Sequence, residues 1–203
     1  MRYTGPKVKL SRRLGVNLFE NDKGARALEK RPYPPGDHGG RRSRTPSDYD
    51  LRLREKQKLR FAYGVAERQF RRLYEEALRT TGPTGHNLLR FLELRLDNVA
   101  FRAGWARTRP QSRQFAGHGL LRLNGRRVTI PSIRVRAGDV LELGAKARTM
   151  FVVRHNLDTL DRAVPEWLER SEDRGAVRVL AEPAREQIRV QADETLVVEL
   201  YSR

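Results

Sequence analysis

Apolar residues recur with helical spacing in the middle of the chain and with strand-like alternation after residue 120. One stripe follows the i, i+3, i+4, i+7, i+8 pattern typical of a helix with a single buried face. It predicts a helix that begins after Gly64 and ends at residues 81–83, Thr-Gly-Pro. A second stripe predicts one continuous helix over residues 86–103. The first stripe consists of Phe70, Leu73, Tyr74, Ala77 and Leu78, and the second of Leu89, Leu92, Leu96, Val99 and Ala103.

Capping residues predict two more helices. Ser47 or Asp48 can cap a helix whose first turn is acidic and which continues to Tyr63. Thr108 can cap a shorter helix with Pro110 in its first turn. Residues 117–119, Gly-His-Gly, are expected to end that shorter helix.

The sequence LRLNGRRVTIPS, residues 121–132, predicts a tight two-stranded hairpin. Asn124 and Gly125 supply the two positive-φ residues that a type I′ turn needs. Residues 138–139, Gly-Asp, predict a second tight turn before a strand over residues 140–143. Residues 165–168, PEWL, are expected to anchor a short packed segment, and residues 196–201, LVVELY, to form a strand.

The charge of the chain indicates its class of partner. The 203 residues include 42 Lys+Arg and 25 Asp+Glu, a formal net charge of +17. A folded chain tolerates such self-repulsion most readily beside a polyanion, so a nucleic acid is the expected partner. Lys+Arg outnumber Asp+Glu by 21 to 10 in residues 1–80 and by 11 to 3 in residues 81–140. In residues 141–203 there are 10 basic and 12 acidic residues. Arginine supplies 35 of the 42 basic residues, and we expect both phosphate binding and the codon preference of a GC-rich genome to contribute to this share.

Several kinds of chemistry are excluded or unsupported. The sequence contains no cysteine, which excludes disulfides, thiolate zinc sites and cysteine nucleophiles. Its four histidines, at 38, 86, 118 and 155, have no helical metal-ligand spacing, so we expect no metal and no cofactor. No stretch approaches the ~18 apolar residues of a membrane span, and the basic start lacks the apolar stretch of a secretory signal. We therefore expect no membrane partner, no small-molecule substrate and a cytoplasmic location.

The basic residues gather in three places. Residues 1–46 are rich in Gly, Pro and Arg with little apolar periodicity, which predicts an extended basic arm. The arm is either a disordered tail or a segment that orders only against RNA. The helix after residue 47 carries nearly one-signed charge at positions 52–60, which favours RNA over simple solvation. The aromatic residues of the first apolar stripe are expected to pack rather than to stack on bases.

The third place is the module of helix, short helix and hairpin over residues 95–143. Its arginines at 107, 109, 113, 126 and 127 could line one positive groove that reads RNA by its backbone geometry. The alternative is that they are solvated surface charges, but each lies on the face of the module expected to meet RNA. His118 could donate to a phosphate or could only end its helix, and Asn124 is first a turn residue.

These motifs resemble a known family. RLDNVAFRAGWARTRPQSRQFAGHG, then LRLNGRRVTIPS, then VRAGD resemble the αL RNA-binding module of the ribosomal protein S-four family. YTGPKVKLSRR at the start, PSDYDLRLREKQKLRFAYGVAERQFRRLYEEA in the helical region and LVVELYSR at the end extend the resemblance over nearly the whole chain. Zinc-binding members carry a Cys-x-x-Cys pair where this sequence has Val8 and Ser11, so packing and RNA must order the arm here instead.

The resemblance implies an α+β fold in which the αL module is inserted into a helical domain. We expect a basic extended arm over 1–46, a helical domain over 47–92, the module over 93–155 and a C-terminal segment, 156–203, that packs with the helical domain. The implied function is structural: primary binding to the 5′ domain of small-subunit rRNA at a multi-helix junction, which nucleates assembly of the subunit body. Implied partners are ribosomal protein S-five, at an interface linked to translational accuracy, other small-subunit proteins and mRNA near its channel into the subunit.

Two other functions compete with this one. Pseudouridine synthases carry a similar module and a catalytic aspartate in an Arg-Leu-Asp motif, which residues 95–97 match. The tripeptide is predicted to lie inside a helix, and too few residues remain for a catalytic domain, so Asp97 is expected to be a surface or salt-bridged residue. No Gly-x-Ser-x-Gly elbow or phosphate-binding Gly-rich loop is present. A free RNA chaperone would need only the module, and the long arm and basic helices argue against it.

The predicted RNA-binding residues come from the arm, the basic helices and the module. They are Arg2, Lys7, Lys9, Arg12, Arg13, Arg41, Arg42, Arg44, Arg52, Arg54, Lys56, Lys58, Arg60, Arg68, Arg71, Arg72, Arg107, Arg109, Arg113, His118, Asn124, Arg126 and Arg127.

Overall fold

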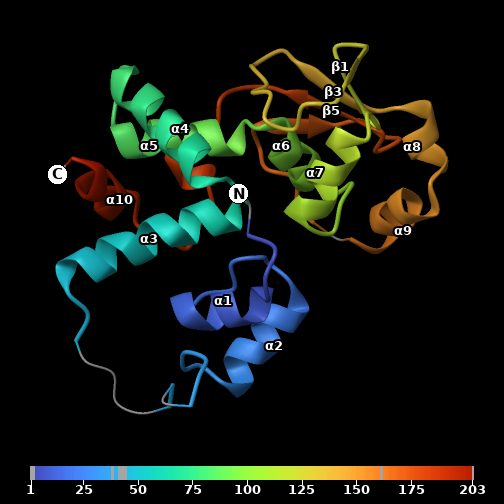
Figure 1. Cartoon of the computed structure of the whole chain (residues 1–203). Helices are drawn as coiled ribbons and strands as arrows, with labels where there is room; N and C mark the ends of the chain where they lie inside the picture. The colour runs from blue at the N-terminus through green and yellow to red at the C-terminus, as the bar shows by residue number, and fades with distance from the viewer. Residues whose placement is uncertain (1–2, 38, 41–44, 161, 203) are drawn as a thin grey trace. The chain divides into compact units, whose positions relative to one another are not determined.

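The computed structural model describes residues 3–37, 39–40, 45–160 and 162–202. The chain forms two compact units, of which unit 1 comprises residues 1–88 and 189–203 and unit 2 comprises residues 89–188. Unit 1 is helical, and unit 2 combines helices with a five-stranded antiparallel sheet (Figure 1). The predicted α+β class is confirmed.

Unit 1 begins with two helices that we expected to be extended chain. They are α1 (Lys7–Leu14) and α2 (Asp22–Lys30), which lie side by side (Figure 1). Leu10, Leu14 and Leu18 form a small buried cluster beneath α1. Asn21 caps α2 through its side chain, which accepts from the Gly24 amide at 2.6 Å. Such short, mostly polar helices carry too weak an apolar stripe to be recognised from periodicity.

The other helices of unit 1 largely follow the sequence. Ser47 caps α3 (Asp48–Ala62), and α4 (Glu67–Arg79) buries Phe70, Tyr74 and Ala77 as predicted. The last residue of the predicted buried stripe, Leu78, is not buried, since it is 59% exposed. The boundary between the units falls inside α5 (Thr84–Glu93).

The segment LVVELY was predicted to be a strand and is instead the helix α10 (Glu194–Tyr201). Asp193 caps it by accepting from the Thr195 amide at 2.8 Å. Val197 is buried, and Tyr201 stacks on Tyr74 with ring centroids 4.6 Å apart. Packing against α3 and α4 therefore overrides the strand preference of its β-branched residues.

The continuous helix predicted over residues 86–103 is also wrong, because the chain is extended between α5 and α6 (Leu96–Arg102). Backbone bonds to a distant segment explain the interruption: the Leu96 amide donates to the Ile133 carbonyl at 2.8 Å, and the Val135 amide to the Leu94 carbonyl at 2.9 Å. Arg95 accordingly precedes α6 rather than lying inside it.

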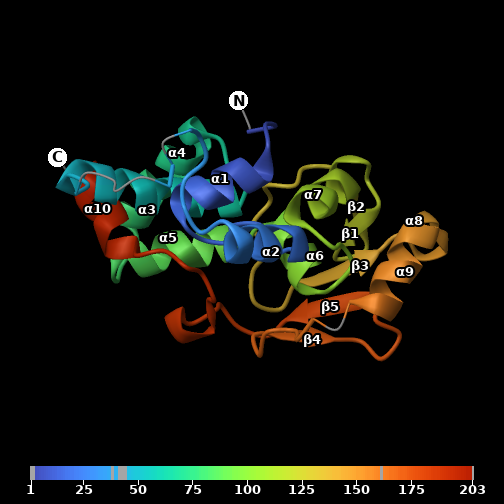
Figure 2. The ribbon, with the colours of Figure 1, turned by 90° about the horizontal axis from the view of Figure 1, so that it is seen from below.

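The sheet of unit 2 has the strand order β2-β1-β3-β5-β4. Its strands are β1 (Leu121–Leu123), β2 (Arg126–Val128), β3 (Val140–Leu143), β4 (Leu168–Arg170) and β5 (Ala176–Val179). The hairpin and the strand over 140–143 are confirmed, and Trp167 and Leu168 are buried as expected for a packed segment. Figure 2 shows β4 and β5 together at the end of the sheet. Because both strands pair into this sheet, unit 2 reaches residue 188 and is longer than the 93–155 module that we expected.

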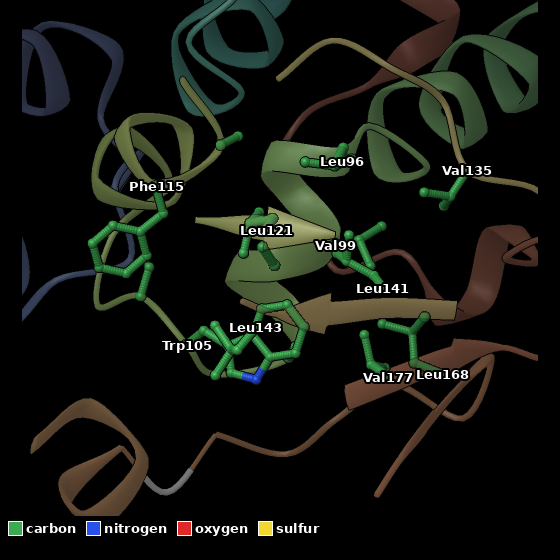
Figure 3. Packing of buried hydrophobic residues seen from close by; sticks show 14 of the residues in the cluster. Leu96, Val99, Trp105, Phe115, Leu121, Val135, Leu141, Leu143, Leu168 and Val177 are labelled. Atoms are coloured by element: carbon green, nitrogen blue, oxygen red, sulfur yellow. The ribbon is translucent and has the colours of Figure 1, made fainter. Parts of the chain in front are cut away.

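One face of the sheet packs on α6 and on α7 (Arg109–Gly117). Leu96 and Val99 of α6 share one buried cluster with Leu121 and Leu141 of the sheet, and Figure 3 shows Val99 next to Leu141. The remaining elements of unit 2 are α8 (Ala145–Thr149), α9 (Phe151–Thr159) and a 3-10 turn, η1 (Arg185–Gln187). The buried cluster thus joins α6 and α7 to the sheet that carries the hairpin.

Candidate nucleic-acid interface

The β1–β2 hairpin is held rigidly at its turn. Asn124 and Gly125 have φ values of 49° and 77°, as a type I′ turn requires. The Asn124 side chain also ties the turn to the next strand: Nδ2 donates to Asp139 Oδ1 at 2.8 Å, and Oδ1 accepts from the Val140 amide at 2.8 Å. The hairpin therefore presents its side chains in a defined direction.

The short helix α7 is anchored at both ends. Thr108 accepts from the Gln111 amide at 3.4 Å, which confirms the predicted cap. Ser112 is buried and its hydroxyl donates to the Asp97 carbonyl. At the other end the His118 amide donates to the Gln114 carbonyl at 2.9 Å, so the helix-ending role of His118 is confirmed.

A network of buried polar side chains joins α5, α6 and α7. Glu93 is 1% exposed and accepts from Arg102 Nη2 at 2.7 Å, from Arg102 Nε at 3.0 Å and from Asn98 Nδ2 at 2.7 Å. Arg109 Nε donates to Asn98 Oδ1 at 2.8 Å. Charges this deep are stable only with such partners, so the network sets how the helices meet.

Two predicted RNA-binding arginines belong wholly or partly to the interior. Arg109 is 8% exposed, and its guanidinium also lies over the Phe101 ring, 4.5 Å from the centroid. Arg113 is half-buried and its Nη1 lies 3.4 Å from Asp97 Oδ2. Asp97 is buried and holds Arg95 in a two-pronged ion pair at 3.0 and 2.8 Å. Of the two roles expected for Asp97, the salt-bridged one is confirmed.

The other predicted residues of the module lie at the surface. Arg126 and Arg127 are exposed on β2, and Arg107, His118 and Asn124 are exposed nearby in sequence. The Arg127 Nη2 donates to the His118 carbonyl at 3.4 Å, which brings the hairpin and the end of α7 together.

A cleft of about 510 Å³ opens where the hairpin, the end of α7 and α8 meet. We call it the hairpin cleft; it is lined by residues 118–120, Arg122, Arg127, residues 144–147 and Met150. Arg122 and Lys146 were not predicted from the sequence. The alternation in Leu121-Arg122-Leu123, with both leucines facing the core, could have identified Arg122 as outward-facing, but no local signal marks Lys146.

The predicted residues of α1 divide into two groups. Lys7, Lys9 and Arg13 are exposed. Arg12 instead holds the loop after α2: its Nε lies 3.2 Å from the carbonyls of Arg31 and Tyr33, and its Nη2 lies 3.4 Å from the Pro34 carbonyl. This clamp secures the loop to α1 beside the leucine cluster. The predicted residues Arg2, Arg41, Arg42 and Arg44 lie outside the described residues.

Most of the predicted basic side chains of α3 form ion pairs with acidic residues, so the charge of the helix is not of one sign as we expected. Arg52 binds Glu199 at 2.8 Å, Lys58 binds Glu55 at 2.6 Å, and Lys56 and Arg60 approach Glu67 at 2.8 and 3.5 Å. The pairs with Glu67 fasten α3 to α4 and the pair with Glu199 fastens it to α10, whereas Lys58–Glu55 lies within α3. Arg54 is exposed on α3, as are Arg68, Arg71 and Arg72 on α4, where Arg71 also pairs with Glu75 at 3.2 Å.

Glu67 is the centre of the α3–α4–α10 contact. Burial alone would raise its pKa, but hydrogen bonds from Lys56 and Tyr201, with the charges of Lys56 and Arg60, lower it below the ordinary value. Burial, followed by the neighbouring Glu67 charge, raises the pKa of Tyr201 far above its usual range. Tyr201 therefore stays protonated and donates to Glu67 Oε1 at 2.9 Å.

Within the described part of the chain, no three His, Asp or Glu side chains converge in a way that could hold a metal ion. Among the same residues, no helix has the length and apolar character needed to cross a bilayer.

Comparison with known proteins assigns the family. Residues 2–93 match the family model described as the ribosomal protein S4/S9 N-terminal domain, and residues 94–141 match the S4 domain. The chain is 50% identical over 205 residues to small ribosomal subunit protein uS4 of Cutibacterium acnes, with 100% of this chain and 99% of the relative covered. The chain belongs to the uS4 family. The uS4 proteins of Rubrobacter xylanophilus and Thermus thermophilus are each 48% identical, over 202 and 209 residues, with the same coverage.

Membership of the uS4 family confirms the predicted resemblance and the class of small-subunit ribosomal protein. The boundary between the two family models, at residues 93 and 94, coincides with the extended link between α5 and α6. The S4 domain match ends within β3, so α8, α9, β4 and β5 lie beyond it.

Proposed function

We propose that this uS4-family chain is a non-catalytic structural component of the small ribosomal subunit in the cytoplasm, and that it binds small-subunit rRNA directly. One observation carries the proposal: a hairpin locked at its turn presents Arg126 and Arg127 next to the end of α7. The planar guanidinium of arginine can donate two hydrogen bonds to phosphate oxygens. When several arginines are held in fixed positions, they can match the backbone of one particular RNA fold.

The proposed contact surface of unit 2 consists of side chains exposed in the structure. It includes Arg107, His118, Arg126 and Arg127, with Arg113 at its edge. Arg109 supports this surface from inside, since its guanidinium bonds to Asn98. From unit 1 we propose Lys7, Lys9, Arg13, Arg54, Arg68 and Arg72 as further phosphate contacts, because they are exposed.

We further propose that the RNA is the folded 5′ domain of small-subunit rRNA, bound at a multi-helix junction, and that binding nucleates assembly of the subunit body. Contacts with ribosomal protein S-five and with mRNA near its channel, and a contribution to translational accuracy, belong to the same proposal. The family resemblance supports these parts. Purified S-five protein should bind the assembled chain–RNA complex, and failure to bind would remove that contact.

The main test measures affinity for the folded 5′ domain and for a structured RNA of equal length and unrelated sequence, across several salt concentrations. We expect a large preference for the 5′ domain that persists at high salt. Equal binding that salt abolishes would reduce the chain to a nonspecific polycation and refute the proposal.

The hairpin is tested by replacing Arg126 and Arg127 together with Ala. Each lost phosphate contact should flatten the slope of log affinity against log salt by about 0.7 to 0.9, so about 1.5 for the pair. The matched control replaces Arg178 and Arg189, which are also exposed and remove the same charge elsewhere. An unchanged slope in the hairpin variant, or an equal loss in the control, would exclude a specific hairpin contact.

A further inference from the structure

The hairpin cleft is built from parts of unit 2 that are distant in sequence. Its walls are the end of α7, the start of β1, the returning strand β2 and the chain that leaves β3 and enters α8. One wall, residues 144–147 with Met150, lies beyond the S4 domain match at residues 94–141. The cleft is therefore a feature of the whole unit.

The charge of the cleft has one sign. Its ionisable lining side chains are His118, Arg122, Arg127 and Lys146, and no Asp or Glu is among its lining residues. Arg122 and Arg127 are also directly opposite each other in the β1–β2 register. Glu142 of β3 lies opposite Arg122 on its other side and offsets that charge, yet the ionisable residues that line the cleft itself are all basic, so the lining favours an anionic occupant.

The rest of the lining is small or apolar. Leu120 and Ala147 are buried, and Met150 is partly buried at the edge of the core. Methionine is a flexible, polarisable side chain that suits contact with a flat ring. The cleft thus combines a cationic rim with an apolar wall, as a site for one phosphate and one base requires.

Two glycines allow close contacts between the walls of the cleft. Gly119 has φ 67°, and a Cβ there would collide with the Arg127 guanidinium, which instead lies across the end of α7. Gly144 donates from its amide to the Leu120 carbonyl at 2.8 Å, and a Cβ there would lie 3.1 Å from that oxygen. Gly119 therefore leaves room for the Arg127 guanidinium at the rim, and Gly144 lets the chain before α8 lie close to Leu120.

We propose that the hairpin cleft binds a single unpaired nucleotide of the rRNA, its phosphate against Arg122, Arg127 and Lys146 and its base against Leu120 and Met150. The inference rests on the proposed rRNA binding and names the element that unit 2 recognises. A volume of about 510 Å³ is in the range of sites that hold small molecules and is too small for a duplex. Proteins distinguish RNAs mainly through such unstacked nucleotides in loops and junctions.

The first test replaces Lys146 with Ala and measures affinity for the folded 5′ domain. Loss of one charged contact should weaken binding about tenfold and flatten the salt slope by about 0.7. Arg154→Ala is the matched control, because Arg154 is exposed on α9 and does not line the cleft. Met150→Ala should weaken binding equally at every salt concentration and leave the slope unchanged, since it removes a base contact and no charge.

The second test places a photo-crosslinking amino acid at position 150 of the full chain. Crosslinks should map to one unpaired nucleotide of the 5′ domain, and the same nucleotide should lose its chemical protection in the Lys146 variant. Crosslinks spread along paired helices, or none, would overturn the inference. So would tight binding of a free nucleoside monophosphate that Lys146→Ala abolishes while rRNA affinity is unchanged, because the cleft would then be a small-ligand site.

The outcomes separate the two proposals. If the wild-type chain prefers the 5′ domain but the Lys146 and Met150 variants bind like wild type, only the cleft assignment fails. If the wild-type chain shows no preference, the proposed function fails first.

Discussion

Replacing Glu93 with Gln should destabilise unit 2 severely. The carboxylate accepts three hydrogen bonds, two from Arg102 and one from Asn98. The variant places an amide, which has only one accepting oxygen, beside a guanidinium whose residue is only 9% exposed. Removing one partner of a buried ion pair costs about 3–5 kcal/mol, because the other charge keeps its full desolvation penalty.

That loss is a large fraction of the free energy of unfolding of a typical domain, which is about 5–15 kcal/mol. Urea unfolding followed by tryptophan fluorescence measures it selectively, because both tryptophans, Trp105 and Trp167, are buried in unit 2. The midpoint should shift strongly to lower urea with little change in slope.

A double-mutant cycle supplies the control. Arg102→Met alone removes the other partner, and the Glu93→Gln/Arg102→Met pair should lose at least about 2 kcal/mol less than the sum of the two single losses. The reasoning is refuted if Glu93→Gln lowers the free energy of unfolding by less than about 1 kcal/mol, or if the two losses simply add.

Three smaller predictions concern the sheet and unit 1. Leu141→Ala should lower the free energy of unfolding, measured in urea, by about 2–5 kcal/mol, because the side chain is fully buried between its neighbours on the paired strands. A loss under about 1 kcal/mol would contradict this and mean that neighbouring side chains fill the cavity. Asn124→Ala should lower the free energy of unfolding by about 1–2 kcal/mol, because it removes the side-chain oxygen that accepts from the Val140 amide and places alanine at a positive φ. An unchanged melting temperature would contradict this prediction. Glu67→Gln should flatten the acid side of the stability–pH curve: a lowered carboxyl pKa stabilises above the unfolded value of about 4.5, and this is lost as pH falls through the folded value. Thermal melts from pH 3 to 7 measure this effect, and identical curves would exclude it.

The elements that could be predicted from the sequence are those with local causes. Thr108 caps its helix by bonding three residues ahead, and Asn124 and Gly125 form their turn from their own backbone preferences. The strand over residues 140–143 follows a turn whose Gly138 has φ 90°. In each case the deciding interaction spans only a few residues, so it is visible in a short window.

The errors have distant causes. The helix is interrupted at Arg95, which is extended because the chain around it bonds to residues 133–135, some 40 positions later, although its spacing continues the helical stripe. Residues 196–201 are helical because Tyr201 packs on Tyr74. Arg109 and Arg126 look alike in a sequence, yet one is buried against Asn98 and the other is exposed. Only the tertiary fold separates a supporting arginine from a surface one.

The division of unit 1 into two stretches of chain has a consequence for biosynthesis. Unit 2 is continuous, so it can fold once residue 188 has left the translating ribosome. Unit 1 must wait for residues 189–203, because α10 packs on α3 and its Glu199 pairs with Arg52. We therefore expect a state during synthesis in which the hairpin and its cleft can already be formed while α3 still lacks its contact with α10. The part of the proposed rRNA surface that lies on unit 2 can therefore form before unit 1 does.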